Sequence, residues 1–187
     1  MAIKKLGRFD EPGHRVTGDR RGRNRGAGWD FVHVSVDDAT RLADVEVLAD
    51  ERRQTTTGFL LRALRWFRTQ GIRAERVMTD NGSACRSRRF ARALRLLAIR
   101  HIFTRPDIPR TNGKASPSQR PRTDGCAPLD IQTLLPEWAD GLRSPSSAAR
   151  NADLHRWLDW FDRTRPHAAL NGLSPIDQMN NLMRMHR

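Results

Sequence analysis

The sequence has few cysteines, and this limits the kinds of site it can form. Cys85 and Cys126 are the two cysteines among 187 residues, and neither belongs to a CxxC pair or has a histidine at zinc-ligand spacing. Neither a disulfide framework nor a structural zinc site is predicted, and a reducing compartment is expected.

Long apolar runs are also missing. No stretch approaches the roughly 18 apolar residues that a membrane-spanning helix requires, and the segment after Met1 has no hydrophobic signal core. We therefore expect a cytoplasmic protein, which would be associated with the nucleoid if it binds DNA.

Positive charge is what the sequence has in excess. It contains 34 Lys and Arg residues against 21 Asp and Glu residues, a formal net charge of +13. Such a surplus attracts polyanions and gives strong, salt-dependent binding to phosphates, so nucleic acid is the expected partner. Only Lys4, Lys5 and Lys114 are lysines. The arginine excess favours bidentate phosphate contacts, although codon bias in a GC-rich genome explains the ratio of arginine to lysine equally well.

Hydrophobic periodicity predicts an α/β domain in which helices cover a mixed sheet. Strands are predicted over 29–36, 43–47, 72–78 and 101–103, the first two forming a hairpin that turns at 38–41. Helices are predicted from caps at Thr55 to Thr57 up to Gly71, from Ser87 through Phe90, Ala91, Leu94 and Leu97, and from Ser146 or Ser147 through Leu154, Trp157, Leu158 and Phe161.

Two polar segments interrupt this pattern. Residues 7–28 are rich in glycine and arginine, which is typical of a loop or a mobile basic hairpin. Residues 104–115 form a basic segment punctuated by proline and glycine. It is either a mobile element that handles a polyanion beside a catalytic site or an ordinary surface loop.

Asp80 follows the predicted strand over 72–78. Ligands and metals usually gather at the carboxyl ends of strands in such a sheet, so Asp80 is a candidate metal ligand. Asp, Asn and Gly are also standard turn residues, so Asp80-Asn81-Gly82 could be only a turn.

Several motifs occur in the order found in one protein family. They are residues 3–9, 17–20, 37–41, 77–83, 104–106, 109–115 and 160–170, with Pro175. Together they resemble the core of insertion-sequence transposases that share the retroviral-integrase catalytic domain.

The resemblance implies an RNase-H-like fold, with a mixed sheet, flanking helices and a C-terminal helical extension. It also implies three acidic residues that hold two Mg²⁺ or Mn²⁺ ions for phosphodiester cleavage and strand transfer, because two hard cations need bridging oxygen ligands. The expected organisation is a catalytic core over 1–115, an irregular and disordered insertion over 116–130, and C-terminal helices over 131–187 that complete the core.

The chain departs from the family pattern at two of the three acidic positions. The first aspartate is replaced by Ala2, so the chain is expected to begin inside the catalytic domain, without the family's upstream DNA-binding region. The third acidic residue of the family is a glutamate. Its position falls on Ser116 when it is counted forwards from Asp80 and on Pro128 when it is counted backwards from the predicted helix that begins near Ile131. Asp130 would point away from the site. We interpret residues 116–130 as a sign of local gene decay.

The resemblance leaves Asp80 as the expected catalytic residue and metal ligand. Asp37 is a possible substitute carboxylate, because the second strand neighbours the first, although it is equally a turn residue. DNA contacts are expected from Lys4, Lys5, Arg105, Arg110, Asn112 and Lys114.

Three functions are compatible with the sequence. One is a metal-dependent transposase or integrase core that cuts and joins mobile-element ends and target DNA, with impaired catalysis. Another is a non-catalytic DNA-binding remnant, which forms homo-oligomers or pairs with an intact transposase and inhibits it. A basic RNA-binding protein would explain the charge but not the ordered motifs, and the chain has no tyrosine for base stacking.

Overall fold

The structure is a computed structural model that describes residues 1–10, 28–104, 135–140 and 144–185. The motifs at 17–20 and 109–115 and the segment 116–130 therefore lie outside the described residues.

Two groups of paired strands form the centre of the molecule. Strands β1 (Ala2–Arg8), β2 (Gly28–Val36) and β3 (Ala43–Leu48) make an antiparallel sheet in the order β1-β2-β3. Strands β4 (Arg76–Thr79) and β5 (Arg100–Phe103) pair in parallel. The Met1 amino group donates a hydrogen bond to the Met78 carbonyl oxygen (2.8 Å) and so links the β1 edge to β4.

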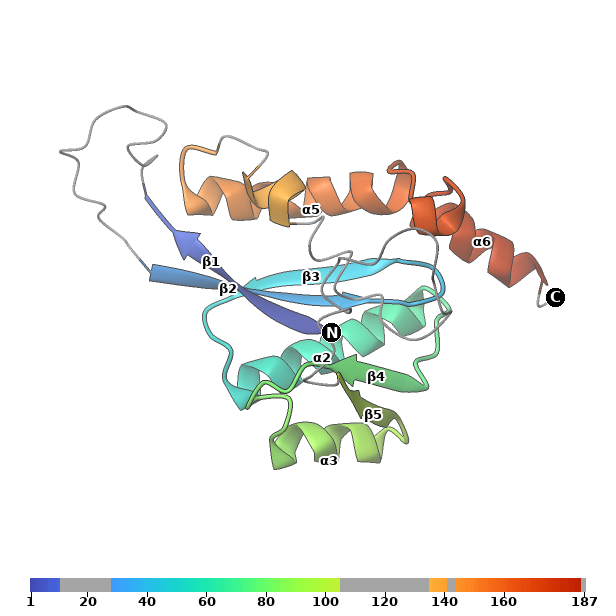
Figure 1. The fold of residues 1–187 in the computed structure, drawn as a ribbon, viewed down its shortest axis with the longest axis horizontal. Coiled ribbons are helices and arrows are strands. Elements are labelled where there is room, and N and C mark those ends of the chain that lie inside the picture. The colour runs from blue at the N-terminus through green and yellow to red at the C-terminus, as the bar shows by residue number, and fades with distance from the viewer. Residues whose placement is uncertain (11–27, 105–134, 141–143, 186–187) are drawn as a thin grey trace.

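Helices cover both faces of these strands. Helices α2 (Arg53–Thr69) and α3 (Arg88–Leu96) lie on one side, and α5 (Ser147–Arg163) lies on the other and leads towards α6 (Pro175–Met185) (Figure 1). A π-helical segment (Leu135–Asp140) contacts α5, and a 3-10 turn (Ala168–Leu170) precedes α6. The predicted α/β class with flanking helices is confirmed.

The two faces of the sheet belong to two hydrophobic clusters. The cluster on the α5 side contains Val32, Val34, Ala43, Val45, Trp138, Leu154, Trp157 and Phe161. The cluster on the α2 and α3 side contains Met1, Leu42, Phe59, Leu60, Ala63, Phe67, Val77, Phe90 and Leu94. Alternate residues of a strand point to opposite faces, so Val32 and Val34 of β2 lie together on the α5 side, whereas Val77 of β4 packs with the helices on the other side.

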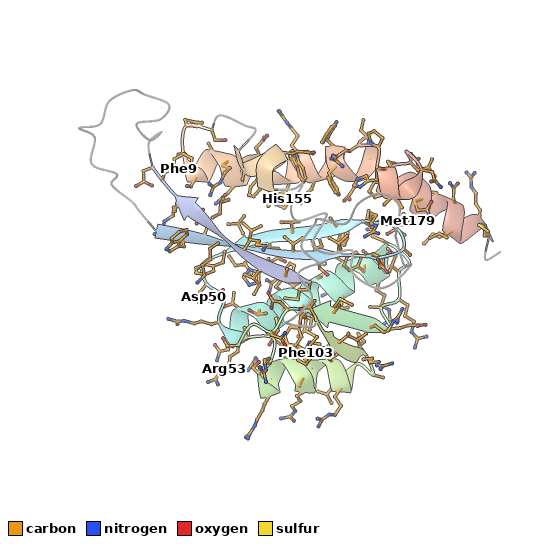
Figure 2. All side chains as sticks on the ribbon, in the orientation of Figure 1. Phe9, Asp50, Arg53, Phe103, His155 and Met179 are labelled. Carbon is orange, nitrogen blue, oxygen red and sulfur yellow. The ribbon has the colours of Figure 1, made fainter. Side chains whose placement is uncertain are left out.

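The start of α5 is tied to the first two strands by buried polar contacts. Ser146 caps the helix by accepting from the Ala149 amide, as predicted. Phe9, at the end of β1 beside the start of α5 (Figure 2), donates its amide to Ser147 Oγ (2.7 Å). Arg150, 2% exposed, donates to Asp30 Oδ2 (2.9 Å). These bonds join the C-terminal helices to the N-terminal strands.

The predicted start of α2 is wrong. The helix begins at Arg53, and the predicted cap residues lie inside it. The Thr57 hydroxyl donates to the Arg53 carbonyl oxygen (2.6 Å), while Asp50 accepts from the Arg52 amide (2.9 Å) just before the helix. Threonine hydroxyls commonly bond back into the preceding turn, so a threonine run does not fix where a helix begins.

The strand predicted over 72–78 begins later than expected. Gly71 ends α2 in a left-handed conformation (φ +82°), and the Ile72 amide closes the helix by donating to the Phe67 carbonyl oxygen. Pairing with β5 begins only at Arg76, so β4 spans Arg76–Thr79. Leu97, predicted on the buried face of α3, is 48% exposed, because α3 ends at Leu96.

Candidate metal and nucleic-acid site at the end of β4

Asp80 is the first residue after β4, and its side chain is exposed. The preceding residue, Thr79, is buried, and its hydroxyl lies 2.9 Å from His101 Nε2 on β5. The Thr79 carbonyl oxygen accepts from the Thr104 amide (2.9 Å). Pairing of the two strands therefore continues to the point where Asp80 emerges, and this holds the start of the turn in place.

The segment after Asp80 is also a turn. Asp80 Oδ1 accepts from the Gly82 amide (3.0 Å), and Asn81 Nδ2 donates to the Thr104 carbonyl oxygen (2.8 Å). A Cβ at position 82 would lie 2.9 Å from Asp80 Oδ1, so a side chain there would displace the carboxylate from this position. The turn interpretation is therefore confirmed, and the role of Asp80 as a metal ligand stays a prediction. A tight turn forms, and it presents an exposed carboxylate at the end of a strand.

Ala2 lies on the strand next to β4. The bond from Met1 to Met78 places the beginning of β1 beside β4, two residues before Asp80. Ala2 pairs with Val34 and packs against the cluster on the α5 side. A carboxylate at position 2 would extend from that face of the sheet, near the end of β4. Position 2 therefore lies near β4, and its role as the first acidic position of the family stays a prediction.

Asp37 lies elsewhere. Its Oδ2 accepts from the Thr40 amide (2.9 Å) and the Thr40 hydroxyl (2.8 Å), which closes the turn between β2 and β3. It is three positions beyond Val34, roughly 10 Å along the strand, and lines a cavity of about 480 Å³ with Arg76 at the start of β4. The structure does not bring Asp37 to Asp80, which follows the other end of β4.

Lys4 and Lys5 point to opposite faces of β1. Lys4 pairs with Val32 and so lies on the same face as Ala2, exposed and two positions away. Lys5 lies on the α2 side, where Nζ is 2.8 Å from Glu51 Oε1 and 5.4 Å from the Phe31 ring centre. Lys4 therefore adds positive charge on the face of Ala2, whereas Lys5 already has an acidic partner.

A buried thiol lies close to Asp80. Cys85 is 2% exposed, and burial raises its pKa to about 11, with a further contribution from the negative charge of Asp80. The thiol is therefore protonated at neutral pH and adds no charge to the site. Burial likewise lowers the pKa of His101, so the imidazole beside Thr79 is neutral.

The remaining predicted site residues lie outside the described ranges. These are Arg105, Arg110, Asn112 and Lys114, together with the third acidic position at Ser116 or Pro128. Among the described residues, no group of three or more His, Cys, Asp or Glu side chains could hold a metal ion. Asp80 alone does not fit the pair of divalent cations that the resemblance implies, because each cation requires several oxygen ligands.

The sequence analysis did not single out a basic surface on α3. Arg88, Arg92 and Arg95 are exposed on one side of this helix, which follows the Asp80 turn. The spacing of these arginines, four and then three residues, could have predicted this basic surface, because residues at such spacings share a helix face.

Comparisons with known proteins are consistent with this geometry. The family model described as integrase core domain matches residues 10–109. The solved catalytic core domain of BIV integrase superposes with a TM-score of 0.59 at 12% identity, covering 99% of this chain and 97% of that one. This likeness confirms the predicted RNase-H-like fold. No curated protein sequence matches the chain. Within the described ranges, no helix combines the length and apolar composition that crossing a bilayer demands.

Proposed function

Because the chain belongs to the integrase core domain family, we propose that it is the DNA-integration core of an insertion-sequence transposase whose catalytic centre is impaired. The family supports a role in DNA integration, and the predicted integrase-type catalytic core is confirmed. The net charge of +13 suits a DNA partner. The expected location is the cytoplasm, with the nucleoid.

The arrangement at the end of β4 carries the proposal. Asp80 presents an exposed carboxylate there, while the neighbouring strand has Ala2 at the position where a second carboxylate would face it. Integrase core domains generally depend on divalent metals, here Mg²⁺ or Mn²⁺. With one carboxylate at this point among the described residues, the site has too few ligands for two such cations to share, so their binding and strand transfer should be weak.

A reconstruction experiment tests this proposal. Strand transfer of element-end DNA is measured in Mg²⁺ and in Mn²⁺ for three proteins. They are the wild-type chain, a variant that combines Ala2→Asp with replacement of residues 116–130 by Glu-Arg-Phe, and a variant that combines the same replacement with Ala2→Asn. We expect turnover only in the first variant, and its loss when Asp80→Asn is added. The Ala2→Asn version is the matched control, because asparagine has the same shape without the charge.

Two results would contradict the proposal. Robust turnover by the wild-type chain that disappears in Asp80→Asn would mean that catalysis is not impaired. If the Ala2→Asp reconstruction folded well but was inactive, position 2 would not be the missing ligand position of the metal site.

A second candidate function is regulation of an intact transposase. The same missing carboxylate favours it, because a chain that binds DNA without cutting it occupies the element ends. We expect stoichiometric amounts of this chain to inhibit strand transfer by an intact relative, and Asp80→Asn to inhibit equally well. Loss of inhibition in Asp80→Asn would exclude a purely non-catalytic role.

A further inference from the structure

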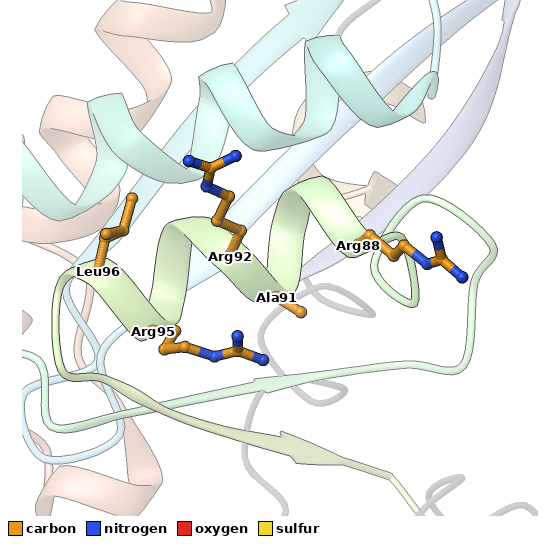
Figure 3. A pocket seen from close by; sticks show the side chains of 5 residues that line it. All are labelled: Arg88, Ala91, Arg92, Arg95 and Leu96. Carbon is orange, nitrogen blue, oxygen red and sulfur yellow. The ribbon is translucent and has the colours of Figure 1, made fainter.

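The exposed side of α3 carries an unusual density of positive charge. Arg88, Arg92 and Arg95, with Ala91 and Leu96, line an open groove of about 530 Å³ (Figure 3). Arg92 and Arg95 diverge to either side of the helix, and Arg88 extends past its N-terminal end (Figure 3). The small Ala91 side chain leaves space between the guanidinium groups.

This charge is not neutralised within the described part of the fold. Residues 81–100 contain six arginines and no Asp or Glu. None of Arg88, Arg92 and Arg95 forms an ion pair with a described residue, whereas Arg62, Arg150 and Arg165 each pair with a carboxylate. The groove therefore presents three guanidinium groups to solvent.

The arginines do not stabilise the helix that carries them. Arg88 and Arg92 are four residues apart and Arg92 and Arg95 three apart, and like charges at these spacings repel. Arg88 also lies in the first turn of α3, where the helix dipole disfavours a cation, and that turn has no acidic residue. Helix stability therefore does not explain the stripe, whereas an anionic ligand would offset the repulsion.

The groove begins beside the candidate site. The turn after Asp80 leads directly into α3, with the Arg86 amide donating to the Gly82 carbonyl oxygen (3.1 Å) and Ser87 capping the helix. A polyanion held over Asp80 would therefore meet the start of α3 next.

We propose that the arginine groove of α3 binds the sugar-phosphate backbone of duplex DNA and extends the DNA contact beyond the Asp80 turn. Arg88 and Arg95 are about 10 Å apart along the helix axis, and duplex DNA carries one negative charge per roughly 1.7 Å of its axis. Each guanidinium can thus reach its own phosphate and contact it through two N–H groups. The proposal rests on the proposed function only in taking DNA as the partner.

Salt-dependent DNA binding tests the groove. The wild-type chain is compared with R88Q/R92Q/R95Q by fluorescence anisotropy, using a short labelled duplex of random sequence without divalent metal. The control variant is R156Q/R163Q/R184Q, which removes the same charge from α5, on the opposite side of the strands (Figure 1), and from α6. If each arginine of the groove contacts one phosphate, the slope of log K against log salt should fall by about 2.7 in the first variant and change little in the control.

Further variants and melting temperatures test whether a lower slope comes from lost phosphate contacts and not from misfolding. Glutamine and arginine have similar helix propensities and the three side chains are exposed, so melting temperatures should not fall. R88K/R92K/R95K should retain the slope, because lysine also neutralises phosphate. Each single glutamine variant should lower the slope by about 0.9.

Several outcomes would overturn the proposal. An equal decrease in both triple variants would show only a general charge effect, and no decrease in either would show that DNA does not use the groove. If a polyglutamate peptide bound the wild-type chain but not R88Q/R92Q/R95Q while DNA binding was unchanged, the groove would serve an acidic protein. These binding measurements do not depend on catalysis at Asp80. The proposal for the arginine groove and the proposed function can therefore fail separately.

Discussion

The buried pair of Asp30 and Arg150 offers a test of whether the C-terminal helices belong to the same folded core as the strands. Asp30 lies on β2 and is 8% exposed, and Arg150 lies on α5 and is 2% exposed. Arg150 donates to Asp30 Oδ2 (2.9 Å) and to the Gly7 carbonyl oxygen (3.1 Å). The substitution Asp30→Asn keeps the shape of the side chain and removes its charge.

The expected cost is large because the guanidinium would stay buried after losing the negative charge of Asp30. Removing one partner of a buried ion pair costs about 3–5 kcal/mol. For a chain of this size the melting temperature should fall by roughly 6–20 °C. The matched control is Asp153→Asn, which breaks the 3.4 Å contact with the exposed Arg156 on the same helix and should cost less than about 1 kcal/mol.

Urea unfolding followed by tryptophan fluorescence measures both variants. Trp138 is fully buried and its Nε1 donates to the Arg150 carbonyl oxygen (3.2 Å), so it reports on this region. Arg150→Met added to Asp30→Asn should cost less than the sum of the single changes, because the pair acts as a unit. If Asp30→Asn cost no more than Asp153→Asn, the pair would not stabilise the core, and the prediction that the C-terminal helices complete the core would lose its strongest support.

Three further predictions concern titration and backbone geometry. Burial lowers the pKa of His33, so below about pH 6.5 the unfolded chain binds a proton at this residue more readily than the folded chain does. Between pH 7 and 5 the unfolding free energy of the wild-type chain should therefore fall relative to that of His33→Gln, as urea titrations at each pH would show. Burial raises the pKa of Asp162 to about 7, so its ionisation opposes folding as the pH rises from about 4 to 7. Asparagine at position 162 can still accept the hydrogen bond from the Ala43 amide. Asp162→Asn should therefore stabilise the protein by on the order of 2 kcal/mol at pH 8 and should give no gain at pH 4. Equal melting temperatures of the variant and the wild-type chain at pH 8 would contradict this prediction. Gly71→Ala should cost about 1–2 kcal/mol, since its φ is +82° and a Cβ would overlap the Met183 methyl group; adding Met183→Ala should recover the steric part in thermal melts.

Patterns between neighbouring residues in the sequence predicted much of the secondary structure. The strands over 29–36 and 43–47 and the caps at Ser87 and Ser146 were predicted correctly, because strand alternation and capping depend on neighbours in the chain. The starts of α2 and β4 were wrong. The start of β4 depends on pairing with β5, which begins at Arg76. The start of α2 was missed because the threonine hydroxyl at position 57 bonds back to Arg53 and does not cap the helix.

The sequence by itself determined the charge, the family and the position of Asp80 after a strand, because composition and ordered motifs do not require contacts between distant residues. Only the tertiary structure decided what surrounds Asp80. The hydrogen bond from Met1 to Met78 brings the start of β1 beside β4, and Asp37 lies towards the other end of β4. The pleat of β1 separates Lys4 from Lys5. Packing of Phe90 and Leu94 against the core turns the opposite side of α3, with its arginines, towards solvent.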